Sequence, residues 1–198
     1  MVLHQLLRAT NAGLRWMGGA TSAEYMPVRF NGTWMWLSRP AWNSCYMDYE
    51  PHMAGAIRAN LTPGGVFYDI GAHVGLWSLC ASTLVGPEGH VVACEPSDAF
   101  HVLEANVGKL GNVDCLRMAV GERAGRGEFH GQGAATSGSL VRSVTEINQK
   151  YHPDAAITTT EVAIETLSSM ASSKPLPSLV KVDVEGYEYQ VLEGGASS

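Results

Sequence analysis

The sequence contains little of what marks several common protein classes. Only four of its 198 residues are cysteine, with no C-x-x-C pair and no histidine at zinc-finger spacing, so neither a zinc finger nor a disulfide scaffold is indicated, and we expect no metal site. Charged residues make up 16% of the chain, and 13 Lys and Arg face 19 Asp and Glu, for a net charge of −6. Because a nucleic-acid backbone is bound by clustered cations, we expect no nucleic-acid partner.

Long hydrophobic runs are also missing. No stretch of about 18 apolar residues is present, so we expect no membrane span. Residues 1–19 place leucines at helical spacing, but arginines and an asparagine interrupt them, so a continuous signal-peptide core is lacking. A cytoplasmic protein is therefore expected. The hydrophobic content of 45% is that of a globular chain rather than a disordered one.

What the chain does contain is a strand-to-helix turn at residues 66–77, VFYDIGAHVGLW. An apolar run ends in Asp69, a turn with Gly71 and Gly75 follows, and helix-compatible residues resume. This pattern predicts a buried parallel strand followed by a helix. The first turn of that helix would present free N–H groups, and the glycines would let a ligand approach the backbone closely. We therefore expect a nucleotide-like cofactor at this turn.

The details of the turn discriminate between cofactors. The dinucleotide fingerprint G-x-G-x-x-G fails, because His73 and Leu76 occupy its second and third glycine positions. The Asp69 carboxylate, two residues before Gly71, would repel a pyrophosphate and attract an ammonium group. S-adenosylmethionine carries an ammonium group, a ribose and an adenine but no phosphate. The turn thus favours S-adenosylmethionine.

A second carboxylate follows the next apolar run. Glu95 ends the segment VVACE about 26 residues after Asp69, near the spacing of roughly 20 that is typical of a ribose-binding acid. It could accept hydrogen bonds from both ribose hydroxyls. Either acid alone could merely cap the following helix. Together, at the ends of adjacent predicted parallel strands, they favour cofactor binding, provided that both carboxylates face a shared crevice.

Three segments of the chain resemble the FkbM-type methyltransferases: residues 67–77, residues 94–96 and residues 179–194, the last with the motif K-x-D-x-E-G. These are class I S-adenosylmethionine-dependent enzymes, many of which act on oxygen. The resemblance runs from about Tyr49 to Gly195. It implies an α/β fold with a doubly wound, mainly parallel sheet of the Rossmann-like class I methyltransferase type, here without the last strands.

The resemblance also implies roles for single residues. Asp69 and the two glycines would bind the methionine end of the cofactor, and Glu95 would bind the ribose. Residues 119–121, a predicted turn after the strand at 113–118, would lie beside the adenine. The cofactor-binding residues expected in this way are Asp69, Gly71, His73, Gly75, Glu95, Ala119 and Val120. Two positions depart from the family. His73 stands where Asn is more frequent, and Ser168 stands where Asp is usual, which puts the role of that acid in question.

The candidate catalytic residues are Asp183 and Glu185. Methyl transfer from a sulfonium is an in-line displacement that depends on positioning, and a hydroxyl acceptor also benefits from a base. Asp183 ends a predicted strand, where open α/β sheets bind ligands, so it ranks first as a base or as a group that orients the acceptor. Glu185 could equally cap the helix that follows. His73 titrates in the right range, but a contact to the cofactor is favoured over a base.

The expected strands are residues 66–70, 90–95, 113–118 and 179–184, with helices near 49–60, 75–85 and 97–110. A right-handed doubly wound sheet with its strands in the order 113–118, 90–95, 66–70 and 179–184 would place residues 179–184 at its edge, although their composition is that of an interior strand. Exposed apolar edges pair with other chains. Either the chain is a fragment, or a partner such as a second copy of the chain covers this edge.

Two regions are expected along the chain. Residues 1–48 form an N-terminal helix and a Trp-rich strand, with Trp34 and Trp36 on one strand face and packed in the core or at a domain edge. Residues 49–198 form the C-terminally incomplete methyltransferase domain. Within it, residues 122–178 form a hairpin of strands 126–130 and 159–166, a loop at 131–140 that serves as a lid, and a helical patch near 144–151.

Three functions compete. The leading one is an S-adenosylmethionine-dependent O-methyltransferase for a small hydroxylated acceptor, such as a sugar or a natural-product scaffold. The second is a non-catalytic binding protein that retains the cofactor fold, which Ser168 and the early terminus favour. The third, a nicotinamide oxidoreductase, is disfavoured by the failed glycine fingerprint. The acceptor cannot be inferred from the sequence, because acceptor pockets are built from variable loops.

Overall fold

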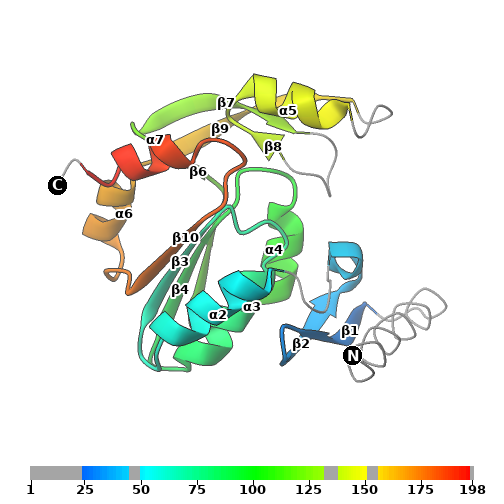
Figure 1. Ribbon diagram of the computed structural model, residues 1–198, viewed down its shortest axis with the longest axis vertical. Coiled ribbons are helices and arrows are strands. Elements are labelled where there is room, and N and C mark those ends of the chain that lie inside the picture. Colours follow the sequence, from blue (N-terminus) through cyan, green and yellow to red (C-terminus); the bar gives the residue numbers. More distant parts are fainter. Residues whose placement is uncertain (1–23, 45–49, 132–137, 151–155, 197–198) are drawn as a thin grey trace. The chain divides into compact units, whose positions relative to one another are not determined.

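The structure is a computed structural model that describes residues 24–44, 50–131, 138–150 and 156–196 (Figure 1). Its contacts divide the chain into two compact units, Met1–Asn60 and Leu61–Ser198, each described by itself. The boundary was expected after residue 48, whereas the structure has it after residue 60. The helix expected at 49–60 therefore belongs to the first unit. The expected N-terminal helix within residues 1–23 lies outside the described residues.

The first unit is built around a β-hairpin. Its elements are β1 (Tyr25–Phe30), β2 (Thr33–Ser38), the 3-10 helix η1 (Arg39–Ser44) and α2 (Pro51–Asn60). The strands pair antiparallel, and one face of the hairpin is buried. Trp34 and Trp36 lie on the other face and are 60% and 64% exposed. Packing of this pair in the core, one of the two expected placements, is wrong, because alternation places Met35 and Leu37 on the covered face instead. Packing at a domain edge stays a prediction.

The second unit contains a four-stranded parallel sheet. Its strands are β3 (Val66–Ile70), β4 (His90–Cys94), β5 (Val113–Leu116) and β10 (Leu179–Val182). They lie in the order β10-β3-β4-β5, with all neighbours parallel, which confirms the expected order. β10 lies at the edge beside β3, as expected. Association of two chains through residues 179–184 stays a prediction.

Helices cover both faces of this sheet (Figure 1). They are α3 (Leu76–Val85), α4 (Phe100–Val107), α6 (Leu167–Ser173) and α7 (Glu188–Glu193). α3 packs on β3 and β4, and α4 packs on β5. On the opposite face, Tyr68 and Ile70 join a core cluster with Met170 of α6 and Val191 of α7. The doubly wound α/β fold is therefore confirmed, although the sequence did not predict α6.

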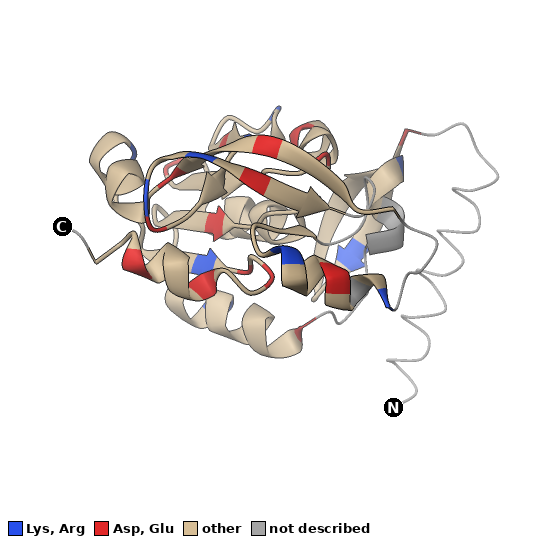
Figure 2. Cartoon of the chain, turned by 90° about the horizontal axis from the view of Figure 1, so that it is seen from above, with Lys and Arg blue, Asp and Glu red and all other residues tan. Residues whose placement is uncertain are grey.

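A second sheet lies above the carboxyl ends of the parallel strands (Figure 1). Its strands are β6 (Ala119–Val120), β7 (Gly125–Gly131), β8 (Gly138–Ser139) and β9 (Thr158–Glu165), in the order β6-β9-β7-β8, with α5 (Arg142–Gln149) against β7 and β8. β7 and β9 pair antiparallel, which confirms the expected hairpin. Figure 2 shows acidic and basic residues along this sheet. Arg126 of β7 forms an ion pair with Glu161 of β9.

The structure differs from the sequence prediction at residues 119–121 and leaves most of the expected lid loop undescribed. Ala119–Gly121 was predicted as a turn, but residues 119–120 form a strand that pairs parallel with β9, because both side chains are buried. Most of the expected lid loop, residues 132–137, lies outside the described residues. Within the part of the chain that the structure describes, none of the helices is both long enough and apolar enough to span a bilayer.

Candidate functional site

The glycine loop after β3 has a left-handed backbone at three positions: φ is +79° at Gly71, +51° at His73 and +85° at Gly75. A Cβ atom at Gly71 would lie 1.9 Å from the carbonyl oxygen of Asp183, and one at Gly75 would lie 2.7 Å from Leu103 Cδ1. Gly71 is therefore required by its contact with the backbone that follows β10, and Gly75 mainly by its left-handed φ, since the Leu103 side chain of α4 can move. The sequence suggested a different reason, the close approach of a ligand.

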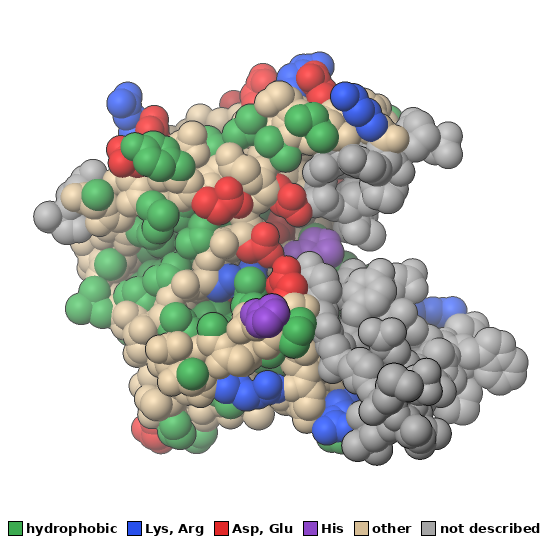
Figure 3. Space-filling view, viewed as in Figure 1, with side chains coloured by type: hydrophobic (Ala, Val, Ile, Leu, Met, Phe, Trp, Pro, Cys, Tyr) green, Lys and Arg blue, Asp and Glu red, His purple; other side chains and the backbone are tan. Residues whose placement is uncertain are grey.

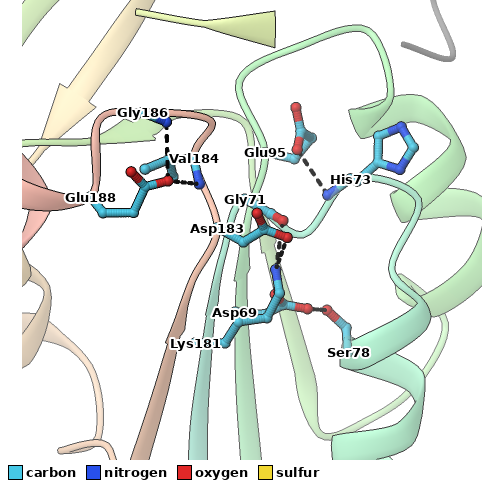
Figure 4. A network of polar contacts seen from close by, with 10 residues as sticks. All are labelled: Asp69, Gly71, His73, Ser78, Glu95, Lys181, Asp183, Val184, Gly186 and Glu188. Carbon is cyan, nitrogen blue, oxygen red and sulfur yellow. Dashed lines mark hydrogen bonds and ion pairs between the residues drawn. The ribbon is translucent and has the colours of Figure 1, made fainter. Parts of the chain in front are cut away.

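Asp69 does not face a crevice. Its side chain is fully buried, Oδ1 accepts a hydrogen bond from Lys181 Nζ at 3.0 Å, and Oδ2 accepts one from the Ser78 hydroxyl at 2.6 Å (Figure 4). The expectation that Asp69 and Glu95 share an open crevice is thus wrong for Asp69. The physical reason is register, since Asp69 and Lys181 are paired positions of β3 and β10 and both side chains lie on the side of the sheet that carries Ser78.

Lys181 was missing from the predicted site, although it lies at its centre (Figure 4). Its side chain is 5% exposed, and Nζ lies 3.0 Å from Asp69 Oδ1, 2.9 Å from the Gly71 carbonyl and 3.5 Å from Asp183 Oδ2. Burial alone would lower the pKa of Lys181, but Asp69 and then Asp183 outweigh it and the pKa is raised. Lys181 is therefore a permanent cation and not a proton acceptor. The sequence feature that could have revealed Lys181 is a lysine within an otherwise apolar predicted strand.

Glu95 connects the end of β4 to the glycine loop. Its Oε2 accepts a hydrogen bond from the backbone N–H of His73 at 2.8 Å, and Oε1 accepts one from the N–H of Ser97 at 2.9 Å. The residue is 6% exposed. Since each carboxylate oxygen has two lone pairs, both oxygens can still accept a further hydrogen bond. Glu95 is thus fixed in place and retains acceptor capacity.

His73 lies beside this carboxylate with a half-buried ring. Burial lowers the pKa of His73, whereas the Glu95 carboxylate opposes that shift and Lys181 adds to it. The imidazole is consequently neutral at neutral pH. Its Nε2 atom is buried and has no hydrogen-bond partner among the described residues. A neutral ring with an unused nitrogen suits a contact to a polar ligand.

Asp183 and Glu185 lie on the loop after β10. The Asp183 side chain is 45% exposed and forms the outer end of the contact with Lys181. Glu185 is exposed and has a φ of +54°. Its pKa is raised, first by partial burial and then by the charges of Asp183 and Glu188. Glu185 is not the N-cap of α7, which is Tyr187; Glu188 Oε1 accepts hydrogen bonds from the loop N–H groups of Val184 and Gly186 (Figure 4).

The remaining candidates lie differently. Ala119 and Val120 point their side chains into two core clusters, so any contact they make to a ligand would be through the backbone. Ser168 lies in the first turn of α6, where its N–H donates to the carbonyl of Gly194 at 3.1 Å. Among the described residues, no group of three or more His, Cys, Asp or Glu is arranged to hold a metal ion.

The structure therefore brings together the ends of three parallel strands. Glu95 joins β4 to the glycine loop, and Lys181 joins that loop to β3 and to Asp183. In the space-filling view, acidic side chains group near the middle of the face, close to a histidine (Figure 3). This is the edge of an α/β sheet at which ligands bind.

Comparison with known proteins identifies this arrangement. The family described as "Methyltransferase FkbM domain" matches residues 69–198, from Asp69 of β3 to the last residue. The chain belongs to this family. The FkbM domain thus includes every residue of the site, and its cofactor is S-adenosylmethionine.

Among curated proteins, the FkbM domain is similar to the hexuronic acid methyltransferase AglP of Haloferax volcanii, with 29% identity over 131 residues. The match covers 65% of this chain and 49% of AglP, so the chain spans about half the length of that relative.

Among solved structures, it is similar to an S-adenosylmethionine-dependent methyltransferase from Aquifex aeolicus (26% identity, TM-score 0.30, 35% of this chain and 38% of that one). Another similar structure is Trm5b from Pyrococcus abyssi, with 22% identity and a TM-score of 0.32; the match covers 51% of this chain and 32% of Trm5b.

Glu95 and His73 of the FkbM domain fit S-adenosylmethionine as expected, whereas Asp69 does not. Glu95 is held by two backbone N–H groups and keeps acceptor capacity of the kind that ribose hydroxyls require, and the buried His73 Nε2 is a polar atom for which the described residues supply no partner. The ammonium group cannot be selected by Asp69, because Lys181 already neutralises that carboxylate. The exposed Asp183 and the loop carbonyls are the groups left to receive positive charge.

Proposed function

We propose that this chain is an S-adenosylmethionine-dependent methyltransferase that methylates a hydroxyl oxygen of a small acceptor, a sugar or a similar molecule. The observation that carries the proposal is the meeting of the glycine loop, Glu95 and Asp183 at the carboxyl ends of β3, β4 and β10. Family membership supports the cofactor, and the similarity to AglP, a hexuronic acid methyltransferase, supports a sugar acceptor.

Two residues of the site would bind the cofactor, and a third would take part in proton transfer. Glu95, fixed by two backbone N–H groups, would hold the ribose, and the neutral His73 ring would contact the cofactor. The bound cofactor supplies a methyl group on a sulfonium, which is already activated for displacement. Asp183, half-exposed at the mouth of the site, would accept the proton of the acceptor hydroxyl or orient that hydroxyl.

The nature of the acceptor atom decides whether Asp183 is needed. A hexuronic acid offers hydroxyls, which must lose a proton, and a carboxylate, which is already ionised and needs no base. An ether product would therefore depend on a carboxylate at position 183, whereas an ester product would not. The exposed position of Asp183 supports transfer to a hydroxyl.

The test compares the wild-type protein with Asp183→Asn, using a labelled methyl donor and glycosides of neutral and uronic sugars. We expect Asp183→Asn to retain S-adenosylmethionine binding, weakened by at most about tenfold because one negative charge is lost, and to lose about 100-fold or more in turnover, the usual contribution of a general base. Glu193→Gln, which changes an exposed acid of α7, is the matched control and should retain full turnover. Unchanged turnover in Asp183→Asn, or an alkali-labile ester product, would contradict the proposal.

The competing function, a non-catalytic binding protein, rests on Ser168 in place of the family's usual Asp. The structure gives Ser168 a backbone contact to Gly194 that does not need a carboxylate side chain. The two functions are separated by the same assay, since a binding protein would take up S-adenosylmethionine without labelling any sugar.

A further inference from the structure

We propose that Lys181 is a positioning residue of this site, which fixes the Asp183 carboxylate and the glycine loop in the arrangement that receives the cofactor. The inference rests on the proposed function, because it concerns how that site is held. It assigns a role to the lysine of the K-x-D-x-E-G motif, whose side chain is almost entirely buried.

The geometry carries the first step. The Lys181 ammonium has three acceptors on three different segments: Asp69 on β3 at 3.0 Å, the Gly71 carbonyl in the loop at 2.9 Å and Asp183 after β10 at 3.5 Å. An ammonium group has three N–H donors, so these contacts use its full capacity. With 5% of the side chain exposed, solvent has little access to replace a lost partner.

The charges carry the second step. Asp69 and Asp183 contribute two negative charges and Lys181 one positive charge, so the three residues together carry one net negative charge. Asp69 is fully buried and Asp183 is 45% exposed. The net charge consequently lies at the outer end, on Asp183. Lys181 thereby holds in place the carboxylate that presents negative charge to a cationic ligand.

A purely structural role is the competing explanation, in which Lys181 only neutralises the buried Asp69. Lys181→Met alone cannot separate the two roles, because it leaves a buried carboxylate without its cation and the protein could fail to fold. The double variant Asp69→Asn/Lys181→Met can. It removes one charge of each sign, keeps the net charge of the three residues, and lets the amide of residue 69 bond to the Ser78 hydroxyl. Besides the ion pair between residues 69 and 181 itself, only the ammonium contacts to Gly71 and Asp183 are lost.

The matched control is Asp114→Asn/Lys174→Met. Lys174 Nζ lies 2.7 Å from Asp114 Oδ2, so the same two substitutions remove an ion pair that is outside the site. The readouts are the melting temperature and the dissociation constants of S-adenosylmethionine and S-adenosylhomocysteine by calorimetry. These two ligands differ by one methyl group and one positive charge. Their affinity ratio therefore reports on the placement of charge in the site, which general loosening of the fold would not change.

For Asp69→Asn/Lys181→Met we expect a melting temperature near that of the wild-type protein. S-adenosylmethionine should bind about tenfold more weakly, and S-adenosylhomocysteine only about threefold more weakly. The control should bind both ligands as the wild type does. Wild-type affinities in the site variant, or an equal loss for both ligands, would overturn the role of Lys181 and leave the proposed function intact. If the wild-type protein binds neither ligand, the proposed function itself fails.

Discussion

At the scale of single residues, the lack of a Cβ atom at Gly71 allows the glycine loop to contact the backbone that follows β10. Gly71 has a left-handed backbone, and a Cβ atom there would lie 1.9 Å from a backbone oxygen, which cannot move away as a flexible side chain would. The loop and the Asp183 segment therefore lie in van der Waals contact. The position of Asp183 relative to the cofactor loop depends on this contact.

Gly71→Ala should consequently be far more damaging than an ordinary glycine substitution. Gly64 is the matched control, because it also has a left-handed backbone (φ +78°), but a Cβ atom added there would have nothing within 4 Å. We expect Gly64→Ala to cost about 1–2 kcal/mol of unfolding free energy, the cost of the left-handed conformation. Gly71→Ala should cost at least about 3 kcal/mol and abolish cofactor binding. Urea unfolding and calorimetry measure both, and equal losses in the two variants would contradict the contact.

His73 is the second position where backbone conformation matters. Its φ of +51° lies in the left-handed region, which Asn adopts readily, and Asn is the residue that the family resemblance favours at this position. We expect His73→Asn to be as stable as the wild type or more stable by up to about 1 kcal/mol, because it also removes the buried Nε2 that lacks a partner among the described residues. His73→Val should lose about 1–2 kcal/mol in the same unfolding assay. A lower stability of His73→Asn than of His73→Val would refute this explanation.

At the scale of elements, the loop between β10 and α7 is held by one side chain of α7. Glu188 accepts hydrogen bonds from the N–H groups of Val184 and Gly186. Partial burial raises the pKa of Glu188, but backbone hydrogen bonds outweigh it, so the pKa is lowered. The carboxylate thus stabilises the folded state above the ordinary glutamate pKa, and this contribution is lost as the pH falls through the lowered value.

This predicts the pH dependence of one variant. Glu188→Gln should melt at a lower temperature than the wild type at pH 7, because the charged acceptor of the loop N–H groups is gone. The difference should shrink as the pH is lowered from about 5 to 3, where Glu188 itself becomes protonated. Melting temperatures of both proteins across this range are the measurement. A difference that stays constant with pH would show that the charge of Glu188 does not stabilise the loop.

Elements with strong local patterns were predictable from the sequence. The apolar runs that became β3, β4 and β10 and their order in the sheet agree with the structure, as does the β7–β9 hairpin. α6 was not predicted because its sequence, LSSMASS, offers one buried residue, Met170, and no apolar stripe. The sequence feature that could have predicted α6 is its N-cap residue Thr166, whose hydroxyl accepts a hydrogen bond from the N–H of Ser169.

The site was harder to predict than the sheet. Asp69 and Lys181 are 112 residues apart, and only the register of β3 against β10 brings them together. No local pattern encodes that register, so the sequence suggested an exposed Asp69 where the structure has a buried ion pair. The place of Glu95 directly after β4 was predicted correctly, because the end of an apolar strand is a local feature, whereas its binding of ribose stays a prediction. Its two backbone N–H donors come from segments adjacent to predicted strands.

At the scale of the whole molecule, every candidate site residue lies in the second unit, Leu61–Ser198, and the FkbM domain match from 69 to 198 lies in the same unit. The first unit contributes a hairpin with two exposed tryptophans and none of the residues discussed for the cofactor. The central claim about the molecule is that the ends of β3, β4 and β10 form a site for a phosphate-free, positively charged nucleoside.

Calorimetric titration of the 198-residue chain with S-adenosylmethionine, S-adenosylhomocysteine and NAD tests that claim most directly, with Glu95→Gln as the site variant. We expect one molecule of S-adenosylmethionine to bind per chain, no binding of NAD, and an affinity at least about tenfold weaker in Glu95→Gln, which removes a charged acceptor of hydrogen bonds. Binding of NAD in preference to S-adenosylmethionine, or an unchanged affinity in Glu95→Gln, would contradict the account.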